Sequence, residues 1–203
     1  MPRIGRVAVV LALSLLFAAC QKTGPSGALP DDMTIGNPQS KVTVIEYASV
    51  GCPVCGRWYR DVYPAFKAKY IDTGRVNFVS KEMLVGGGVE INVAASGFLL
   101  ARCAGKDKYF AVVDAIYKNQ DQAFAAPRET LVDIAKSMGM TEAQFDKCVG
   151  DEAALKALNE RVERHSTKDG VNSTPTFVVN GKQLEPGYHP LEDLDAAIAA
   201  AAK

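Results

Sequence analysis

The sequence is poor in the features that mark several classes of protein. Its 203 residues contain only five cysteines and two histidines, and 23 basic side chains are balanced by 23 acidic ones. Five cysteines are too few for a small scaffold held together by disulfides, and the balanced charge lacks the basic footprint of a nucleic-acid-binding protein. No internal repeat is found. Because 48% of the residues are hydrophobic, the chain can bury a core, and we expect one folded domain with no nucleic-acid partner.

Long hydrophobic runs are also missing, with one exception near the N-terminus. Residues 7–19 are apolar apart from Ser14 and follow Arg3 and Arg6, which is the pattern of a secretory signal. The run is too short to cross a membrane as a helix, which takes about 20 residues. We therefore expect residues 1–19 to be a signal peptide that directs the chain to the periplasm or another extracytoplasmic compartment.

The segment after this run is expected to be a tether. The run ends at Cys20 and resembles a bacterial lipoprotein signal, in which cleavage before that cysteine leaves it lipidated; the alternative is an ordinary cleavage site near an incidental cysteine. Residues 20–39 are rich in Gly, Pro and Ser and have few apolar side chains, which predicts a flexible tether. The folded domain is expected over residues 40–203.

The folded part is predicted to open with a strand, a helix and a second strand. Residues 41–48 are mostly apolar and β-branched, as in a strand buried on both faces, and residues 75–79 predict the second strand. A Cys-x-x-Cys motif starts the helix between them, and Pro64 in the helix interior predicts a kink or break. The helix is indicated by apolar residues four positions apart, namely Val54, Trp58, Val62 and Phe66.

The rest of the chain is predicted to be helical and then to return to strands. Helical apolar spacing recurs over residues 91–104, 109–118, 131–138 and 153–168, and Thr141 with Gln144 predicts the start of a short helix before the last of these. Residues 176–179 predict a strand, and the Asn180-Gly181 dipeptide after it is a strong signal for a hairpin turn. Residues 190–201 predict a final helix. The order of elements therefore indicates an α/β fold that carries a helical insertion.

Two segments resemble a known family. The first, residues 44–55, ends in Cys52-Pro53-Val54-Cys55, and the second, residues 171–181, contains Thr174-Pro175. In this order they resemble the DsbA-like thiol:disulfide oxidoreductases, in particular the extracytoplasmic branch with a long helical insertion. The resemblance extends from Lys41 nearly to the C-terminus. It implies a thioredoxin fold with an inserted α-helical subdomain at about residues 89–169.

The two cysteines of the motif can be assigned roles from their place at the start of a helix. Cys52 is expected where unpaired backbone N–H groups and the helix dipole favour an anion, which lowers the pKa of its thiol and makes it the nucleophile. Cys55, one turn later and more buried, is expected to resolve a mixed disulfide. Pro53 stiffens the turn. A stabilised thiolate favours the dithiol, so the disulfide form is expected to be an oxidant.

The same pair of cysteines has alternative interpretations. Structural zinc usually takes four ligands, and the sequence has no second Cys-x-x-Cys and no paired histidines. A c-type haem needs His at position 56, which is Gly. A purely structural disulfide is disfavoured by the helix that follows. Binding of a soft ion such as Cu(I) stays open, since relatives with this fold are linked to copper tolerance, but neither a resident metal nor another cofactor is expected.

The resemblance implies roles for three further residues. Glu46 aligns with the buried acid of the family; burial should raise its pKa and let it relay a proton to or from Cys55. The alternative is that Glu46 faces solvent on an edge strand. Thr174 and Pro175 resemble the cis-proline loop, which packs against the cysteines and exposes the backbone of Thr174 for strand-like pairing with a client polypeptide. The alternative is an ordinary trans proline.

Two departures from the best-known oxidase leave the direction of electron flow open. Position 54 is Val rather than His, so one stabiliser of the Cys52 thiolate is missing. Position 174 is Thr rather than Val, and a hydroxyl near the sulfurs is also seen in isomerase-like relatives. Isomerases of this fold usually carry an oligomerisation segment, and residues 21–40 have no heptad pattern to supply one. We therefore expect a monomeric oxidase, with a disulfide isomerase or reductase as the alternative.

The remaining cysteines and the partners also follow from the resemblance. Cys103 and Cys148 are expected to pair in a structural disulfide, as in many members of this branch; the alternative is two buried free thiols. The expected clients are unfolded or reduced secreted proteins, and the expected recycling partner is a membrane protein of DsbB type. Apart from that partner, membrane contact is expected only through the lipid anchor at Cys20.

Overall fold

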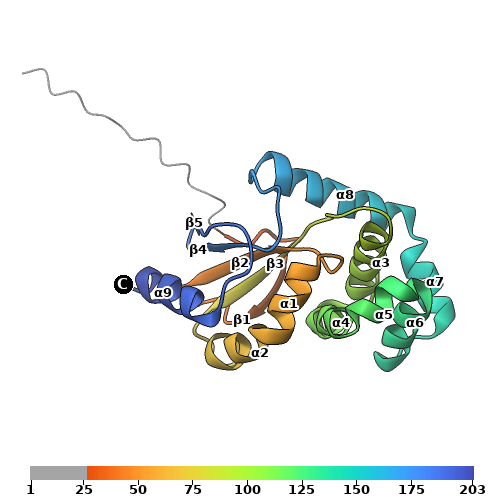
Figure 1. Ribbon diagram of the computed structural model, residues 1–203, viewed down its shortest axis with the longest axis horizontal. Helices are drawn as coiled ribbons and strands as arrows, with labels where there is room; N and C mark the ends of the chain where they lie inside the picture. The colour runs from red at the N-terminus through yellow and green to blue at the C-terminus, as the bar shows by residue number, and fades with distance from the viewer. Residues whose placement is uncertain (1–26) are drawn as a thin grey trace, which may run out of the picture.

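A mixed five-stranded sheet organises the computed structural model, which describes residues 27–203 (Figure 1). The strands are β1 (Met33–Gly36), β2 (Thr43–Ala48), β3 (Asn77–Glu82), β4 (Thr176–Val179) and β5 (Lys182–Gln183). Their order across the sheet is β1-β3-β2-β4-β5, with β2 and β3 parallel and each other neighbouring pair antiparallel. The expected signal peptide, residues 1–19, and the expected lipidation site, Cys20, lie outside the described residues.

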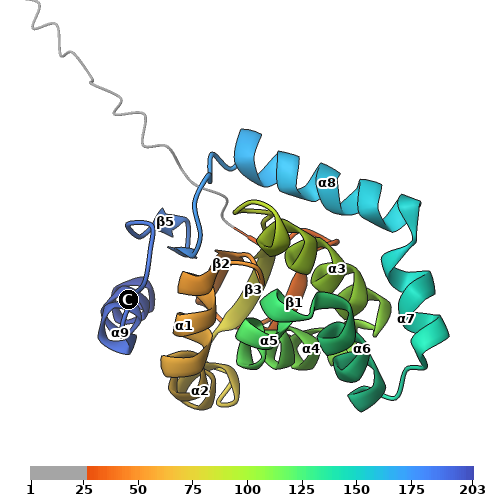
Figure 2. The same cartoon turned by 45° about the vertical axis from the view of Figure 1, so that its right-hand side comes forward.

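Helices cover the sheet and form a separate group beside it. α1 (Pro53–Asp61), α2 (Tyr63–Phe66) and a π-helical turn (Lys67–Ile71) connect β2 to β3, and α9 (Leu191–Ala201) follows β5. Between β3 and β4 the chain forms α3 (Val89–Cys103), α4 (Lys106–Lys118), α5 (Gln120–Ala125), α6 (Pro127–Ser137), α7 (Glu142–Val149) and α8 (Glu152–Thr167). Figures 1 and 2 show α3 to α7 gathered beside the sheet, with α8 running back toward β4. Within residues 27–203 no helix has the length and apolar character needed to cross a membrane.

The central strand is β2, whose side chains alternate between two apolar clusters. Val44 and Ala48 belong to the large core that also contains the buried residues of α1, whereas Ile45 and Tyr47 belong to a smaller cluster. Successive residues of a strand point to opposite faces. Glu46 therefore shares the face of Val44 and Ala48, and the strand holds its carboxyl under α1.

The structure corrects the predicted boundary between tether and domain. β1 pairs antiparallel with β3, so the folded part begins before residue 40 and the tether predicted over residues 20–39 does not reach its predicted end. Met33 is buried, and Asp32 Oδ2 lies 3.7 Å from Lys81 Nζ. A four-residue edge strand needs only one neighbour. Its weak apolar signal is masked by the surrounding Gly and Pro residues, so composition alone did not reveal it.

The helix after the cysteine motif is interrupted near Pro64, as predicted, but its apolar stripe is shorter than predicted. α1 ends at Asp61, and α2 starts at Tyr63 with Pro64 in its first turn, where a missing N–H breaks no helical hydrogen bond. Trp58 is completely buried, whereas Val54 is 38% exposed. The buried stripe therefore begins one turn after Val54, because position 54 lies in the first turn of α1 at the protein surface.

Strand β3 is longer than predicted, and α5 was not predicted at all. β3 continues to Glu82 through polar residues that are typical of a loop. These residues are buried because their charges are paired: Lys81 Nζ lies 3.1 Å from Asp169 Oδ2, and Arg161 Nε lies 2.8 Å from Glu82 Oε2. Such partners are about 80 to 90 positions away in the sequence, beyond any local pattern. The six residues of α5 are too few to show a helical period.

Candidate active site

Cys52 and Cys55 lie at the start of α1, with the exposed residues Pro53 and Val54 between them. Cys52 directly precedes the first helical residue, and its carbonyl accepts the backbone N–H of Gly56 at 3.0 Å. Both thiols are free; Cys52 is 8% exposed and Cys55 is 0% exposed. A sulfur of another molecule can therefore reach Cys52, whereas Cys55 can react only with the sulfur beside it.

The surroundings of Cys52 favour its thiolate. A hydrogen bond with the Cys55 thiol is the main cause that lowers the pKa of Cys52 to about 5, and burial opposes it. The backbone N–H groups of Cys55 and Val54 lower the pKa further. These N–H groups are unpaired donors of the first helical turn, as expected for a cysteine at the start of a helix. The larger contribution comes from the second thiol, which the Cys-x-x-Cys spacing places beside the first.

The pKa of Cys55 is shifted in the opposite direction. Complete burial raises the pKa of this thiol well above its ordinary value, and the negative charges of the Cys52 thiolate and of Glu46 raise it further. Cys55 therefore keeps its proton while Cys52 is ionised. The pKa values of the two thiols in this motif are thus shifted in opposite directions.

Glu46 is completely buried beneath this pair of cysteines. Tyr59 of α1 donates its hydroxyl to Glu46 Oε2 at 3.0 Å, and the other carboxyl oxygen has no hydrogen-bond partner among the described residues. Burial raises the pKa of Glu46 to about 8, against the effect of the Tyr59 hydrogen bond, and the Cys52 thiolate adds to the increase. Because β2 is central, the alternative of a solvent-facing edge residue is excluded. The Glu46 carboxyl therefore keeps its proton near neutral pH.

The Thr174–Pro175 loop closes the site from the other side. The peptide bond between these residues is cis, and the Thr174 carbonyl oxygen lies 3.6 Å from Cys52 Sγ. The Thr174 hydroxyl is buried without a hydrogen-bond partner in the described structure. Pro175 is held from behind, because its carbonyl accepts the backbone N–H of Gly187 at 2.8 Å. The two segments that carry the family resemblance therefore meet at Cys52.

Two tyrosines of the site were not identified from the sequence. The rings of Tyr59 and Tyr117 stack with centroids 4.1 Å apart, and Tyr117 belongs to α4 of the insertion. Burial raises the pKa of the Tyr59 hydroxyl well above its ordinary value, so it stays a hydrogen-bond donor to Glu46. Tyr59 follows Cys55 by four residues and so lies on the same helical face, a spacing that could have identified it. Tyr117 offers no such signal.

Cys103 and Cys148 form a disulfide within the insertion. It joins the last turn of α3 to the last turn of α7, and this bond excludes the alternative of two free thiols. The two residues line a cavity of about 310 Å³ together with Arg102 and Arg161. Cys103 is exposed and Cys148 is buried.

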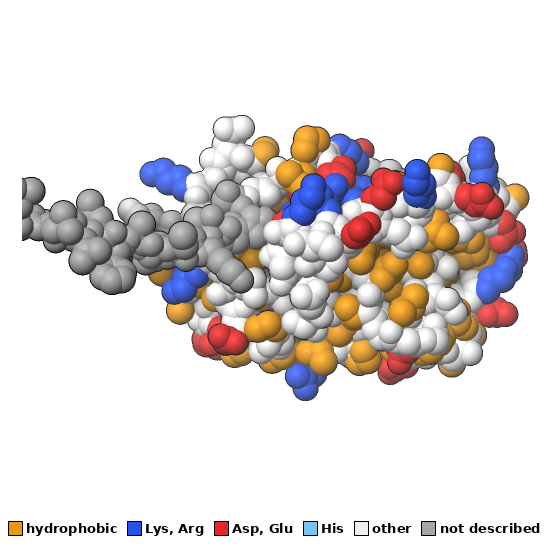
Figure 3. All heavy atoms as spheres, turned by 90° about the horizontal axis from the view of Figure 1, so that it is seen from above, with side chains coloured by type: hydrophobic (Ala, Val, Ile, Leu, Met, Phe, Trp, Pro, Cys, Tyr) orange, Lys and Arg blue, Asp and Glu red, His pale blue; other side chains and the backbone are white. Residues whose placement is uncertain are grey.

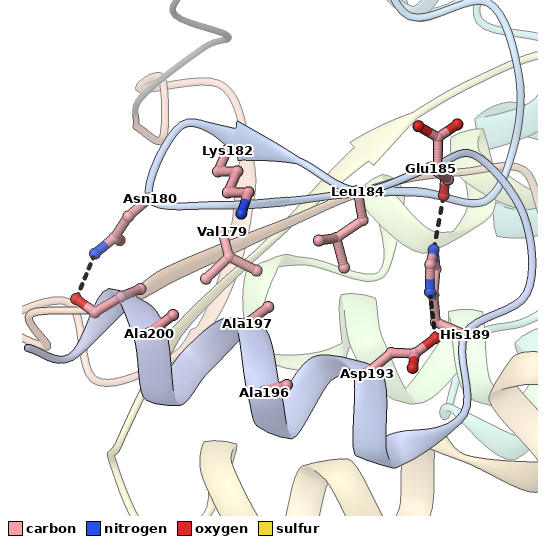
Figure 4. Close-up of a pocket in the computed structure, with 11 residues that line it drawn as sticks. Val179, Asn180, Lys182, Leu184, Glu185, His189, Asp193, Ala196, Ala197 and Ala200 are labelled. Atoms are coloured by element: carbon pink, nitrogen blue, oxygen red, sulfur yellow. Dashed lines mark hydrogen bonds and ion pairs between the residues drawn. The ribbon is translucent and has the colours of Figure 1, made fainter.

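A larger cavity, of about 530 Å³, lies between the β4–β5 hairpin and α9 (Figure 4). The alanine face of α9 forms one wall, and Val179, Lys182 and Leu184 form the opposite one. At one end His189 contacts the Glu185 carbonyl at 2.7 Å. Neither Cys52 nor Cys55 lines this cavity, so the thiol chemistry takes place elsewhere.

The chain is similar to known proteins of disulfide chemistry. A putative protein-disulfide oxidoreductase of Rickettsia bellii is 33% identical over 171 residues, which are 83% of this chain and 63% of that protein. A probable disulfide bond formation protein D of Bacillus cereus is 26% identical over 196 residues, which are 90% of this chain and 85% of that protein. The chain thus spans less than two thirds of the length of the Rickettsia relative.

Solved structures show the same fold. Alpha-DsbA1 of Wolbachia pipientis has a TM-score of 0.77 at 23% identity, covering 86% of this chain and 92% of the other. DsbA of Chlamydia trachomatis has a TM-score of 0.71 at 18% identity, covering 89% and 96%. These likenesses confirm the DsbA-like thioredoxin fold that the resemblance implied. A family model described as Thioredoxin matches residues 28–200. Because this match spans most of the chain, the protein belongs to the thioredoxin family.

Proposed function

We propose that the protein is a thiol:disulfide oxidoreductase that works as an oxidase and transfers the Cys52–Cys55 disulfide to reduced polypeptides. The observation that carries the proposal is the opposite shift of the two thiols, with the pKa of Cys52 lowered to about 5 and that of Cys55 raised. A stabilised Cys52 thiolate favours the reduced enzyme, so the oxidised enzyme readily gives its disulfide away. The names of the Rickettsia and Bacillus relatives support the same class of reaction.

The transfer takes two exchange steps. A client thiolate attacks the Cys52 sulfur of the oxidised enzyme; a client–Cys52 disulfide forms, the Cys52–Cys55 bond breaks, and Cys55 leaves as a thiolate that takes up a proton. The second client thiolate then attacks the client sulfur of the mixed disulfide. The client disulfide forms and Cys52 leaves as a thiolate. The client loses two electrons and the cysteine pair of the enzyme gains them.

Glu46 supplies the proton in the first step. Cys55 is released as a thiolate at a completely buried position, where a bare negative charge is strongly disfavoured. The Glu46 carboxyl is protonated below about pH 8 and is held by Tyr59, so it can neutralise Cys55 without the entry of bulk water. The proton returns to Glu46 when the disulfide forms again.

Client recognition is proposed to depend on backbone and apolar contacts. The backbone of Thr174 beside Cys52 can pair with an extended client, and the exposed Val54 offers an apolar contact next to the reacting sulfur. On the face shown in Figure 3, basic and acidic side chains are interspersed. The backbone of Thr174 and the uncharged side chain of Val54 do not select a client by charge. This supports unfolded or reduced secreted proteins of varied sequence as clients.

We place the reaction outside the cytoplasm. The signal-like residues 1–19 support this location, and so does the disulfide between Cys103 and Cys148, because such bonds persist in oxidising compartments. A lipid at Cys20 would hold the protein at the membrane. A membrane partner of DsbB type would then reoxidise the Cys52–Cys55 pair of a monomeric enzyme.

The test is catalysis by a small amount of the protein. Oxidised protein is mixed with roughly a tenfold excess of a reduced test protein, and glutathione disulfide is added to reoxidise the enzyme. At this ratio a protein that reacts only once would oxidise about a tenth of the test protein. We expect several turnovers and an equilibrium with glutathione that favours the reduced enzyme. Rearrangement of scrambled disulfides without net oxidation would instead support an isomerase. Retention of Cu(I) against a strong chelator, without turnover, would support a copper-handling protein.

A further inference from the structure

A buried glutamine of the helical insertion reaches the turn that carries Cys52. Gln120 is the first residue of α5 and is 2% exposed. Its Nε2 donates to the Val50 carbonyl at 2.9 Å and to the Cys52 carbonyl at 3.0 Å. These two carbonyls flank Gly51, immediately before α1. A side chain about 70 positions away in the sequence therefore holds both ends of the turn that leads into the reacting cysteine.

Gly56 shows how closely this amide fits the active site. A Cβ atom built on Gly56 would lie 2.1 Å from Gln120 Oε1, far inside any real contact distance. Gly56 lies within α1, and its backbone conformation is one that other residues also adopt. Any larger residue at position 56 would force the Gln120 amide to move, because the amide occupies the space of a side chain. The glycine that follows Cys55 is thus matched to Gln120.

The carbonyl that Gln120 holds is connected to the chemistry of Cys52. The Cys52 carbonyl also accepts the first helical hydrogen bond, from the N–H of Gly56 at 3.0 Å. The turn that this bond closes presents the N–H groups of Val54 and Cys55 to the Cys52 sulfur, and both lower the pKa of that thiol. Donation by the Gln120 amide also offsets part of the negative charge of the Val50 and Cys52 carbonyl oxygens.

We propose that Gln120 is a positioning residue through which the helical insertion sets the redox reactivity of Cys52. The inference rests on the proposed function, since it concerns how strongly the Cys52–Cys55 disulfide oxidises a client. With the amide in place, the first turn of α1 is fixed with its N–H groups on the sulfur, and the thiolate is stabilised. Without it, the Val50 carbonyl loses this donor and the Cys52 carbonyl keeps only the N–H of Gly56. The turn then relaxes, and the oxidised protein becomes a weaker oxidant.

The test replaces the amide by an apolar side chain of similar size. Gln120→Met removes both N–H donors and keeps most of the volume, and Gln122→Ala, at an exposed position of the same helix, is the matched control. The rate of alkylation of the reduced protein is measured against pH, together with the equilibrium with glutathione.

For Gln120→Met we expect the alkylation midpoint to rise by about one pH unit, because two neutral hydrogen bonds are lost. The equilibrium constant for reduction should fall about tenfold, equivalent to about 30 mV. Gln122→Ala should match the wild type.

A second variant approaches the same contact from the other partner. Gly56→Ala keeps the residue Gln120 but adds a methyl group 2.1 Å from its amide oxygen, so the amide must move away from the turn. The alkylation midpoint and the equilibrium with glutathione should therefore shift in the same directions as in Gln120→Met. If Gln120→Met folds, as a cooperative melting transition would show, and keeps wild-type values, Gln120 only packs and the proposal is wrong. If Gln120→Met does not fold, Gly56→Ala decides: a wild-type alkylation midpoint and a wild-type equilibrium with glutathione in that variant overturn the proposal for Gln120. A wild-type protein without a thiol of lowered pKa would instead refute the proposed function itself, and this inference with it.

Discussion

At the residue scale, the burial of Glu46 makes the stability of the reduced protein depend on pH. The folded protein holds the Glu46 proton up to about pH 8, whereas an unfolded chain releases it near the ordinary pKa of 4.5. The unfolding free energy contributed by this group is therefore present below pH 4.5 and is lost as pH rises to about 8. Gln at this position cannot ionise. Relative to wild type, Glu46→Gln should gain stability between pH 4.5 and 8, by roughly 4 to 5 kcal/mol at most.

Urea unfolding of the two reduced proteins at pH 5 and pH 8 measures this difference. The lowered pKa of Cys52 contributes the opposite slope, since its stabilisation is lost as pH falls toward about 5. That contribution is common to both proteins and largely cancels in the comparison. An equal stability difference at both pH values would mean that Glu46 is not buried as an uncharged acid.

The same variant tests the proton transfer. If Glu46 protonates the departing Cys55, Glu46→Gln should slow reduction of the enzyme disulfide about tenfold or more below pH 8, where the wild-type carboxyl carries its proton. The rate is followed by the change in Trp58 fluorescence or by quenched alkylation from pH 5 to 9. Glu129→Gln, at an exposed position of α6, is the control. Identical rate profiles for Glu46→Gln and wild type would remove Glu46 from the mechanism.

The two cysteines should give opposite results when each is replaced. Cys52→Ser removes the sulfur that clients can reach, so oxidase activity should be lost with no client attached. Cys55→Ser keeps the reactive thiolate but removes its resolving partner, so mixed disulfides with clients should accumulate. Non-reducing gels followed by mass spectrometry distinguish the two. Trapping of clients by Cys52→Ser would reverse the assignment of the nucleophile.

Residues of the site could be predicted from the sequence where they lie close together along the chain, and not where they meet only in the fold. Cys52, Cys55 and Glu46 lie within ten positions of one another, and the loop at Thr174 has its own recognisable segment, so sequence reasoning could assign them. Gln120 acts only through a contact across about 70 positions. No pattern along the chain distinguishes a buried glutamine of this kind from an exposed one such as Gln122.

At the scale of secondary-structure elements, one buried carboxylate joins the insertion to the sheet. Glu82 of β3 is 1% exposed; it receives Arg102 Nε of α3 at 2.6 Å, Arg161 Nε of α8 at 2.8 Å and the Tyr109 hydroxyl of α4 at 3.2 Å. Three helices are thus attached to one strand through a single side chain. Helical spacing predicted most of these helices, but nothing in it indicated how they attach to the sheet.

Removal of this carboxylate should destabilise the protein without changing the chemistry at Cys52. Glu82→Leu leaves two largely buried arginines without their counter-charge, and breaking a buried ion pair from one side costs about 3 kcal/mol or more. The variant should therefore unfold at lower urea concentration. The pH midpoint for alkylation of Cys52 should not move. A shifted midpoint in a folded variant would mean that the attachment of the insertion also controls the active site through Glu82.

At the scale of the whole molecule, the two cysteine pairs are expected to differ in redox behaviour in a way that their exposure does not explain. Cys103 is exposed and Cys52 is only 8% exposed, so access alone would let a reductant open the Cys103–Cys148 bond first. The stability of the product thiolates gives the opposite order. Opening the Cys52–Cys55 bond yields a thiolate whose pKa is about 5, and a structural disulfide typically has a potential below about −300 mV.

Graded reduction decides between access and thiolate stability. Oxidised protein is equilibrated across a glutathione series, its thiols are alkylated, and labelled cysteines are mapped by mass spectrometry. Cys52 and Cys55 should be labelled at much weaker reducing conditions than Cys103 and Cys148. Simultaneous labelling would mean that the second pair is redox-active as well.

The double variant Cys103→Ala with Cys148→Ala tests what the second bond does. The bond closes a loop between cysteines 45 positions apart, and the chain-entropy estimate for a loop of that length is about 4 kcal/mol, so the variant should melt at a clearly lower temperature. Its Cys52–Cys55 pair should still oxidise a small dithiol at low temperature, because the second bond joins the last turns of α3 and α7 and, among residues 27–203, no hydrogen bond connects it to the cysteine motif. The matched measurement is the melting temperature of wild-type protein in which only the Cys52–Cys55 bond has been reduced. Since the Cys52 thiolate is stabilised in the folded state, this protein should melt at or above the temperature of the fully oxidised one. A double variant that stays folded at low temperature but no longer oxidises the dithiol would show that the second disulfide takes part in the chemistry.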